Sequence, residues 1–109
     1  MKKYKIIYSK ASLESIKNII SFISNVSLEA SKKEFLHIKE TISNLEFFPK
    51  RFPVLKGIML FDKEVHKLVT KNGRYVIIYE IFESTVFIND IIDSRSDSIL
   101  FNDLANNQD

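Results

Sequence analysis

The chain has 109 residues, of which 45% are hydrophobic and 28% charged, and its net charge is +2. This length suits one compact domain, and the composition excludes disorder for most of the chain. The absence of cysteine excludes a disulfide scaffold, a thiolate nucleophile and a cysteine-rich zinc site, and it favours a reducing compartment. Two glycines are too few for the many tight turns of a large barrel or sandwich.

The net charge hides an uneven distribution. Residues 1–56 carry eleven Lys or Arg against five Glu, a net +6, whereas residues 57–109 carry five basic against nine acidic side chains, a net −4. A basic half can meet an acidic partner or nucleic acid, although a solvated lysine-rich surface explains it equally well. The apolar run of residues 6–8 is too short for a signal peptide or a membrane span, so we expect a cytoplasmic protein without a membrane partner.

The first half of the chain predicts a strand and two helices. Residues 4–8 form a short run rich in β-formers, which indicates a strand. Apolar residues then recur at helical spacing as far as Ser24. They recur again after Ser27, a candidate helix cap, and continue to residues 47–48, before Pro49 stops the helix. Since about three residues join them, the two helices should form an antiparallel helical hairpin.

Strands dominate the second half. Residues 48–53, Phe-Pro-Lys-Arg-Phe-Pro, form a rigid basic connector, and residues 54–62 show the least pattern. The Lys-Asn-Gly sequence at residues 71–73 predicts a turn between strands. The strands themselves are predicted at residues 64–70, 74–82 and 85–92.

These elements predict an α+β fold of order β-α-α-β-β-β. The strand over residues 74–82 is apolar on both faces and therefore belongs inside the sheet. We expect the helical hairpin to pack on one face of a small, mainly antiparallel sheet and the other face to stay more open. Residues 1–95 form the single predicted domain, and residues 96–109 form a polar tail.

Few side chains suit catalysis. His66, on a predicted strand, could transfer a proton because imidazole titrates near neutral pH, but a structural role is commoner for a single strand histidine. The sequence has neither a glycine-rich phosphate loop nor paired metal ligands, so we expect no cofactor and no metal. Arg95 follows the last strand, where its guanidinium can bind phosphate or carboxylate. The simpler alternative is an ion pair with one of the acidic residues Asp93, Asp97 and Glu80.

Four motifs carry a family resemblance. The chain opens with Tyr-Lys-Ile-Ile-Tyr-Ser-Lys-Ala, continues with the connector, and closes with Tyr-x-Ile-x-Tyr-x-Ile at residues 75–81 and Ile-Ile-Asp-Ser-Arg at residues 91–95. Combined with the element order, these motifs resemble the RelE/ParE superfamily of bacterial toxins from type II toxin–antitoxin systems. The resemblance spans roughly residues 4–101.

One branch of this superfamily implies an enzyme. RelE-like members cleave messenger RNA in the ribosome without a metal, using Lys and Arg around the phosphate. By this resemblance Lys67 matches a basic position on the second strand and Arg95 the arginine after the last strand. The candidate catalytic residues of this alternative, a metal-free endoribonuclease, are Lys67, Arg74, Arg95 and His66.

Two positions depart from the RelE-like pattern. Val76 stands where an arginine is common on the central strand, and Phe101 stands where a tyrosine is expected. A valine cannot stabilise phosphate charge, and a phenylalanine has no proton to move. The pattern therefore favours the other branch.

ParE-like members share the fold but lack that catalytic set, and they are associated with inhibition of DNA gyrase by binding. The long helical hairpin and the connector favour this branch. In either branch the resemblance implies a hetero-oligomer with a cognate antitoxin, whose acidic, amphipathic C-terminal segment wraps the toxin. A further alternative is an inactive member that only binds the antitoxin. The expected partner-binding residues are Lys50, Arg51, Phe52, Lys67 and Arg95.

Overall fold

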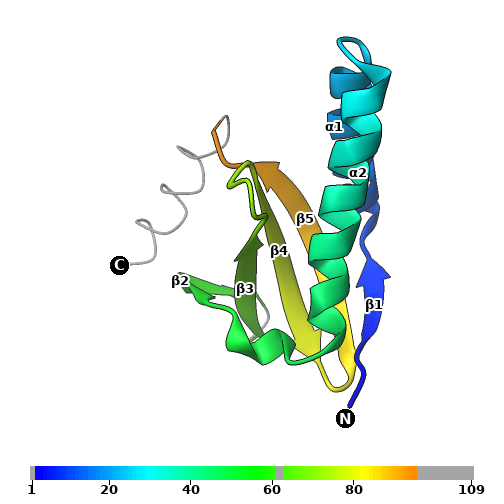
Figure 1. Cartoon of the computed structure of the whole chain (residues 1–109). Coiled ribbons are helices and arrows are strands. Elements are labelled where there is room, and N and C mark those ends of the chain that lie inside the picture. The colour runs from blue at the N-terminus through cyan, green and yellow to red at the C-terminus, as the bar shows by residue number, and fades with distance from the viewer. Residues whose placement is uncertain (1, 61–62, 96–109) are drawn as a thin grey trace.

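The computed structural model describes residues 2–60 and 63–95 (Figure 1). The polar tail predicted over residues 96–109, which includes Phe101, lies outside the described residues. No helix within the described part of the chain is long and apolar enough to cross a membrane.

Two helices form the predicted hairpin. Helix α1 (Lys10–Ser24) and helix α2 (Leu28–Ser43) pack side by side and run in opposite directions (Figure 1). Ser9 and Ser27 cap them, each hydroxyl accepting a hydrogen bond from the backbone N–H three residues later, at 3.0 and 3.1 Å. The predicted hairpin and the cap at Ser27 are therefore confirmed.

Helix α2 ends earlier than the sequence predicted. It gives way at Asn44 to a short 3-10 turn, η1 (Asn44–Glu46), and Phe47 is already extended. A second turn of this kind, η2 (Pro49–Arg51), follows within the connector. Tightening to 3-10 geometry is a common way for a helix to end, and hydrophobic spacing does not reveal it.

A five-stranded sheet in the order β1-β5-β4-β3-β2 carries the hairpin. The first strand runs parallel to β5 and all other pairs are antiparallel, as the mainly antiparallel prediction required. Strand β4 lies between two neighbours, which confirms its predicted place inside the sheet. The strands are β1 (Lys5–Tyr8), β2 (Val54–Leu60), β3 (Lys63–Val69), β4 (Tyr75–Phe82) and β5 (Thr85–Asp93).

Strand β2 is the element that the sequence pattern did not reveal. Its register against β3 is irregular, because Val54 pairs with His66 whereas Met59 pairs with Glu64. Five steps along β2 therefore correspond to two steps along β3. Such an irregularity interrupts the alternation by which a strand is recognised in a sequence. The α+β fold stands, with one more strand at the sheet edge.

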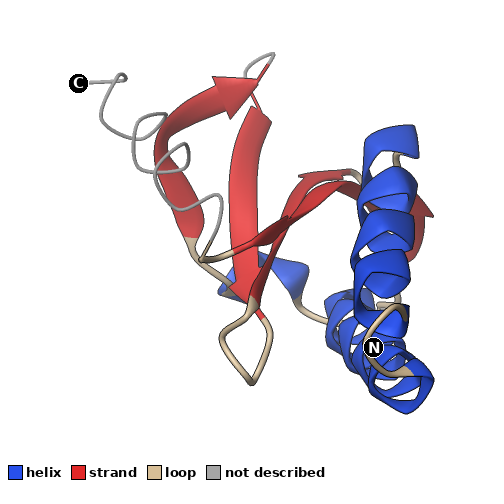
Figure 2. Ribbon diagram, turned by 90° about the horizontal axis from the view of Figure 1, so that it is seen from above, coloured by secondary structure: helices blue, strands red, loops and turns tan. Residues whose placement is uncertain are grey.

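The core lies between the hairpin and the sheet. The helices cover one side of the sheet (Figure 2). Ile38 and Ile42, one helical turn apart on α2, pack with Ile77 and Tyr79 of β4, and all four side chains are at most 1% exposed. Because side chains alternate along a strand, Val76 and its neighbours in register point to the face opposite the helices.

Candidate functional site

The connector is built around an unusual backbone conformation. Phe48 has φ 55° and ψ 47°, the left-handed region, although it is neither glycine nor asparagine. This conformation costs an L-residue about 1–2 kcal/mol. Pro49 is buried behind it, whereas Lys50 and Arg51 are exposed. Other contacts of the connector must therefore offset the strain at Phe48.

Two buried side chains of the sheet hold the connector. The hydroxyl of Tyr79, on β4, donates a hydrogen bond of 2.7 Å to the carbonyl oxygen of Pro49. His66, on β3, donates from Nδ1 to the carbonyl oxygen of Phe52 at 2.9 Å, since a carbonyl can only accept. Their rings stack with centroids 5.3 Å apart and planes at 16°. The backbone is thus fixed on both sides of Lys50 and Arg51.

Burial keeps the Tyr79 hydroxyl in its donating form. The side chain is 0% exposed, and this desolvation raises its pKa above the ordinary 10.0, while the Arg51 charge acts in the opposite direction. At neutral pH the phenol is therefore protonated and available to bind the Pro49 carbonyl.

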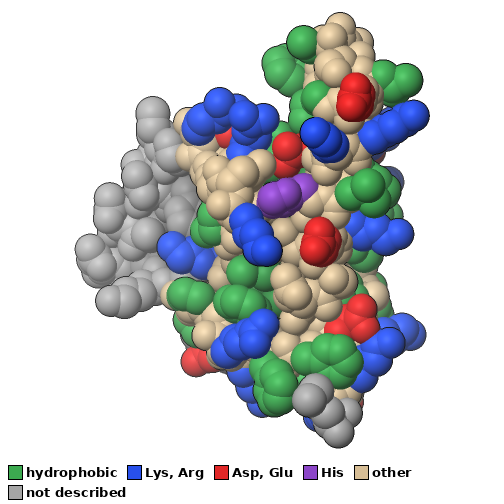
Figure 3. All heavy atoms as spheres, in the orientation of Figure 1, with side chains coloured by type: hydrophobic (Ala, Val, Ile, Leu, Met, Phe, Trp, Pro, Cys, Tyr) green, Lys and Arg blue, Asp and Glu red, His purple; other side chains and the backbone are tan. Residues whose placement is uncertain are grey.

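A pocket opens beside the connector. It has a volume of about 440 Å³, and we call it the connector pocket. Lys and Arg side chains and hydrophobic side chains lie next to each other in this part of the surface, around the N-terminus (Figure 3). Two cations lie over aromatic rings: Lys2 Nζ is 5.1 Å from the Tyr4 centroid, and Arg51 Cζ is 4.7 Å from the Phe52 centroid. The pocket is lined by Lys2, Tyr4, Phe48, Lys50 and Arg51.

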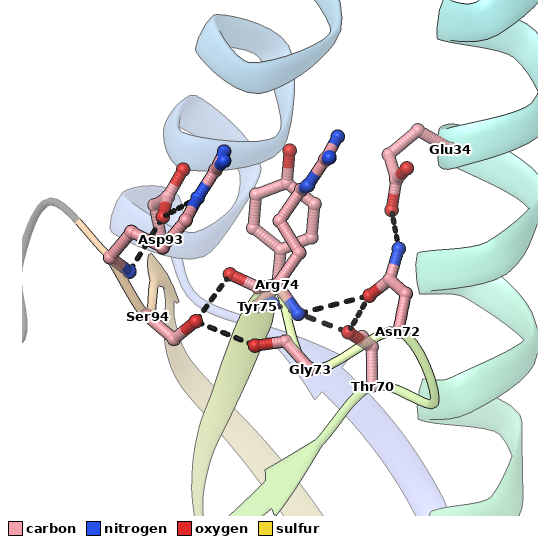
Figure 4. A network of polar contacts seen from close by, with 9 residues as sticks. Glu34, Thr70, Asn72, Gly73, Arg74, Tyr75, Asp93 and Ser94 are labelled. Carbon is pink, nitrogen blue, oxygen red and sulfur yellow. Dashed lines mark hydrogen bonds and ion pairs between the residues drawn. The ribbon is translucent and has the colours of Figure 1, made fainter.

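A second polar cluster lies at the end of the sheet where the turn between β3 and β4 meets the end of β5 (Figure 4). Gly73 has φ 72°, which confirms the predicted turn chemistry. The Ser94 hydroxyl donates to the carbonyl oxygens of Gly73 and Arg74 at 2.6 and 3.0 Å. Arg95 Nε lies 3.6 Å from Asp93 Oδ1, so the ion pair that the sequence offered as the simpler role for this arginine is present. Arg74 and Arg95 thus lie at the same end of the sheet.

The structure separates the remaining candidate catalytic residues. Lys67 pairs with Ile78 in the middle of β3, on the face opposite the helices. Arg74 precedes Ile78 by four residues, which corresponds to about 13 Å along the strand. His66 pairs with Tyr79 on the helix-covered face and is 5% exposed. Lys67 and His66, adjacent in sequence, therefore point to opposite faces, and neither is near Arg74.

Part of the connector pocket had no signal in the sequence. Lys2 and Tyr4 reach the connector because the Tyr4 backbone N–H donates to the Glu46 carbonyl oxygen at 2.7 Å, which holds the N-terminus beside η1. No residue pattern predicts a contact between the N-terminus and the connector, which are far apart in the chain. Within the described residues, no group of three or more His, Cys, Asp or Glu side chains could hold a metal ion.

Comparisons with known proteins agree with the sequence resemblance. A solved structure described as "Chromosomal ParDE TA system from P. aeruginosa" superposes with a TM-score of 0.68 at 11% sequence identity, covering 85% of this chain and 98% of that chain. At this identity the likeness shows the fold. No curated protein sequence matches the chain. The family model described as "ParE toxin of type II toxin-antitoxin system, parDE" matches residues 6–98. The protein belongs to the family of ParE toxins of type II toxin–antitoxin systems.

Proposed function

We propose that this protein inhibits growth by binding DNA gyrase in the cytoplasm, and that a cognate antitoxin neutralises it in a hetero-oligomer. The observation that carries the proposal is the chemistry of the sheet face opposite the helices. Val76 occupies its central strand, opposite Val69 and Ile92, and all three side chains are aliphatic. Aliphatic side chains at these positions cannot stabilise phosphate charge, which supports action by binding.

Metal-free RNA cleavage needs a different arrangement. One group must take a proton and others must stabilise charge at the same phosphate, all within hydrogen-bond reach. The backbones of Lys67 and Arg74 lie about 13 Å apart along the sheet, so only extended side chains directed toward each other could reach the same phosphate. His66 is turned to the helix-covered face, where its Nδ1 is occupied by the Phe52 carbonyl. This separation supports binding over cleavage.

The antitoxin is expected to use two kinds of surface. An apolar groove of about 170 Å³ runs between α1 and α2, with Leu13 55% and Phe35 42% exposed along it. It suits the apolar side of an amphipathic segment. Acidic residues of the same segment would then meet basic side chains of the toxin, since charge complementarity steers association. The proposed partner-binding residues remain Lys50, Arg51, Phe52, Lys67 and Arg95.

A supercoiling assay tests the gyrase proposal. The purified protein should inhibit DNA supercoiling by gyrase at micromolar concentration. A double variant, Lys50→Gln with Arg51→Gln, should weaken this inhibition, because it removes two exposed charges from the connector. The matched control, Lys32→Gln with Lys33→Gln, removes two exposed charges from α2 and should inhibit like the wild type. Supercoiling that proceeds normally with the wild-type protein would contradict the proposal.

Two further measurements separate the alternatives. Expression without the antitoxin should arrest growth, and normal growth would favour the inactive member that only binds an antitoxin. On translating ribosomes the protein should leave messages intact. Message cleavage that Arg95→Ala abolishes would replace the gyrase proposal with the endoribonuclease.

A further inference from the structure

We propose that the connector pocket binds one nucleotide unit of a single-stranded nucleic acid. The base would lie against the aromatic rings and the phosphate against the cationic side chains of the lining. This binding activity goes beyond gyrase inhibition and does not depend on it. The groups concerned are the rings of Tyr4 and Phe48 and the charges of Lys2, Lys50 and Arg51.

The size and lining of the pocket fit this ligand. Its volume of about 440 Å³ falls in the range of roughly 300–1,000 Å³ typical of small-molecule sites. Phe48 is 57% exposed, so much of its ring is open to a stacked base. Proteins that bind single strands commonly combine a positively charged groove with such stacking surfaces. The pocket offers both within one short segment and the adjoining N-terminus.

The hydrogen-bonding groups of the connector suit a phosphate better than the backbone of a peptide. The carbonyl oxygens of Phe48, Pro49, Phe52 and Pro53 all accept hydrogen bonds already, at 3.2, 2.7, 2.9 and 2.9 Å. A docked peptide chain would need acceptors for its backbone N–H groups. A phosphate needs donors only, and lysine and arginine side chains supply them.

The cations of the pocket lack acidic partners among the residues that the structure describes. The nearby ion pair joins Lys3 to Glu46 at 3.1 Å, so Glu46 already has a partner. Lys2, Lys50 and Arg51 are exposed and form no ion pair within residues 2–60 and 63–95. An incoming phosphate would offset their mutual repulsion and release counterions.

The pocket is also formed before any ligand arrives. Tyr79 and His66 fix the connector backbone, and the left-handed conformation of Phe48 sets the direction of its Cα–Cβ bond. Ordering these groups in advance lowers the entropy lost on binding. The strained backbone at Phe48 thus presents an exposed aromatic ring next to exposed charge.

Fluorescence anisotropy with a short labelled oligothymidylate tests the inference, on the full chain and over a range of salt concentrations. Phe48→Ala should weaken binding roughly 10-fold, because base stacking is lost, with the same salt dependence as the wild type. Arg51→Gln should lower the slope of log affinity against log salt by about 0.7, the value for one phosphate contact in a single strand. Phe48→Tyr, which keeps an aromatic ring, should bind like the wild type.

Matched variants control for general effects. Phe22→Ala removes an exposed aromatic ring from the far end of α1, and Lys33→Gln removes an exposed charge from α2. Both should bind the oligonucleotide as the wild type does. Phe48→Asn provides a second test if Phe48→Ala folds poorly, because asparagine tolerates the left-handed backbone. This variant should lose oligonucleotide binding while its circular dichroism spectrum stays native.

The probes also identify the source of the nucleotide. Oligothymidylate, oligouridylate and thymidine monophosphate are compared, and affinity for any of them that depends on Phe48 supports the inference. Equal losses in Phe48→Ala and Phe22→Ala would overturn it. So would inorganic phosphate that competes as well as the monophosphate. The supercoiling assay is read separately, so either proposal can fail alone.

Discussion

The turn between α1 and α2 and the connector after α2 lie at the two ends of the helical layer. Both expose large apolar side chains, but their backbones are attached to the rest of the molecule differently. At the turn between α1 and α2, Phe22 and Val26 are 76% and 85% exposed, and the described hydrogen bonds there are local ones within the chain. At the connector, Phe48 is 57% exposed, but Tyr79 and His66 hold the backbone from the sheet. In Figure 1 the hairpin turn projects well beyond the sheet, whereas the connector lies against it.

This difference separates a preorganised surface from one that is merely exposed. Buried polar side chains that bind a loop fix its geometry and cost free energy when they are removed. A turn supported by its own caps has few tertiary contacts and is free to open locally. Changes at the connector should therefore affect stability and binding together, while changes at the hairpin turn should affect neither strongly.

The largest expected effect is at Tyr79. Replacing it with alanine removes a fully buried ring from the core. The stacking on His66 and the hydrogen bond to Pro49 are lost with the ring. We expect a loss of about 4 kcal/mol in the free energy of unfolding, as for other aromatic residues in cores. Urea unfolding followed by circular dichroism measures it. A loss below about 1 kcal/mol would mean that the connector is not held from the sheet.

Alkaline pH should weaken the same attachment. Burial raises the pKa of Tyr79 above 10.0, so above about pH 10 the unfolded chain loses this proton while the folded chain retains it. The stabilisation is complete below about pH 10 and is lost as the pH rises toward the folded pKa, by at most about 1.4 kcal/mol per pH unit. Tyr79→Phe should cost about 1 kcal/mol at neutral pH.

The control for this prediction is the comparison of the wild type with Tyr79→Phe in the pH dependence of the free energy of unfolding. Between about pH 9 and pH 11, unfolding in urea should show a smaller loss for Tyr79→Phe than for the wild type. Part of the loss should persist in the variant, because burial also raises the pKa of Tyr75 and of Tyr8. Parallel pH profiles would show that Tyr79 does not contribute to the alkaline loss.

A smaller effect is expected at the hairpin turn. Ser27→Ala removes the hydroxyl that accepts the Ala30 N–H at 3.1 Å and so leaves the first turn of α2 uncapped. The expected loss is about 1 kcal/mol in the free energy of unfolding. Oligonucleotide binding should stay unchanged, because the connector is not involved. A drop in binding would show that the two ends are coupled.

The smallest effect is expected at Phe22. Phe22→Ser exchanges a largely exposed ring for a hydroxyl and should change the free energy of unfolding by no more than about 0.5 kcal/mol. The same unfolding experiment measures it. A loss above about 2 kcal/mol would indicate that the hairpin end is covered in solution, which analytical ultracentrifugation of the wild type would reveal as self-association.

Much of the fold was predictable because its causes are local. Ser27 caps α2 through a group three residues away, and Gly73 adopts the positive φ that its turn requires. The apolar residues of β4 placed it inside the sheet. Strand β2 was missed because its irregular register leaves no alternation to detect. The length of α2 was overestimated because a 3-10 turn of three residues is too short to change the hydrophobic spacing visibly.

The candidate site was only partly predictable. The sequence singled out Lys50 and Arg51 by their type and by the prolines around them, but it grouped His66 and Lys67 in one candidate catalytic set although the structure places them on opposite faces. Only the tertiary structure decided which face the helices cover, that Tyr79 and His66 bind the connector, and that Lys2 and Tyr4 complete its pocket. The physical reason is that residue type and periodicity act within one element, whereas burial and hydrogen bonds between distant segments arise only when the elements pack.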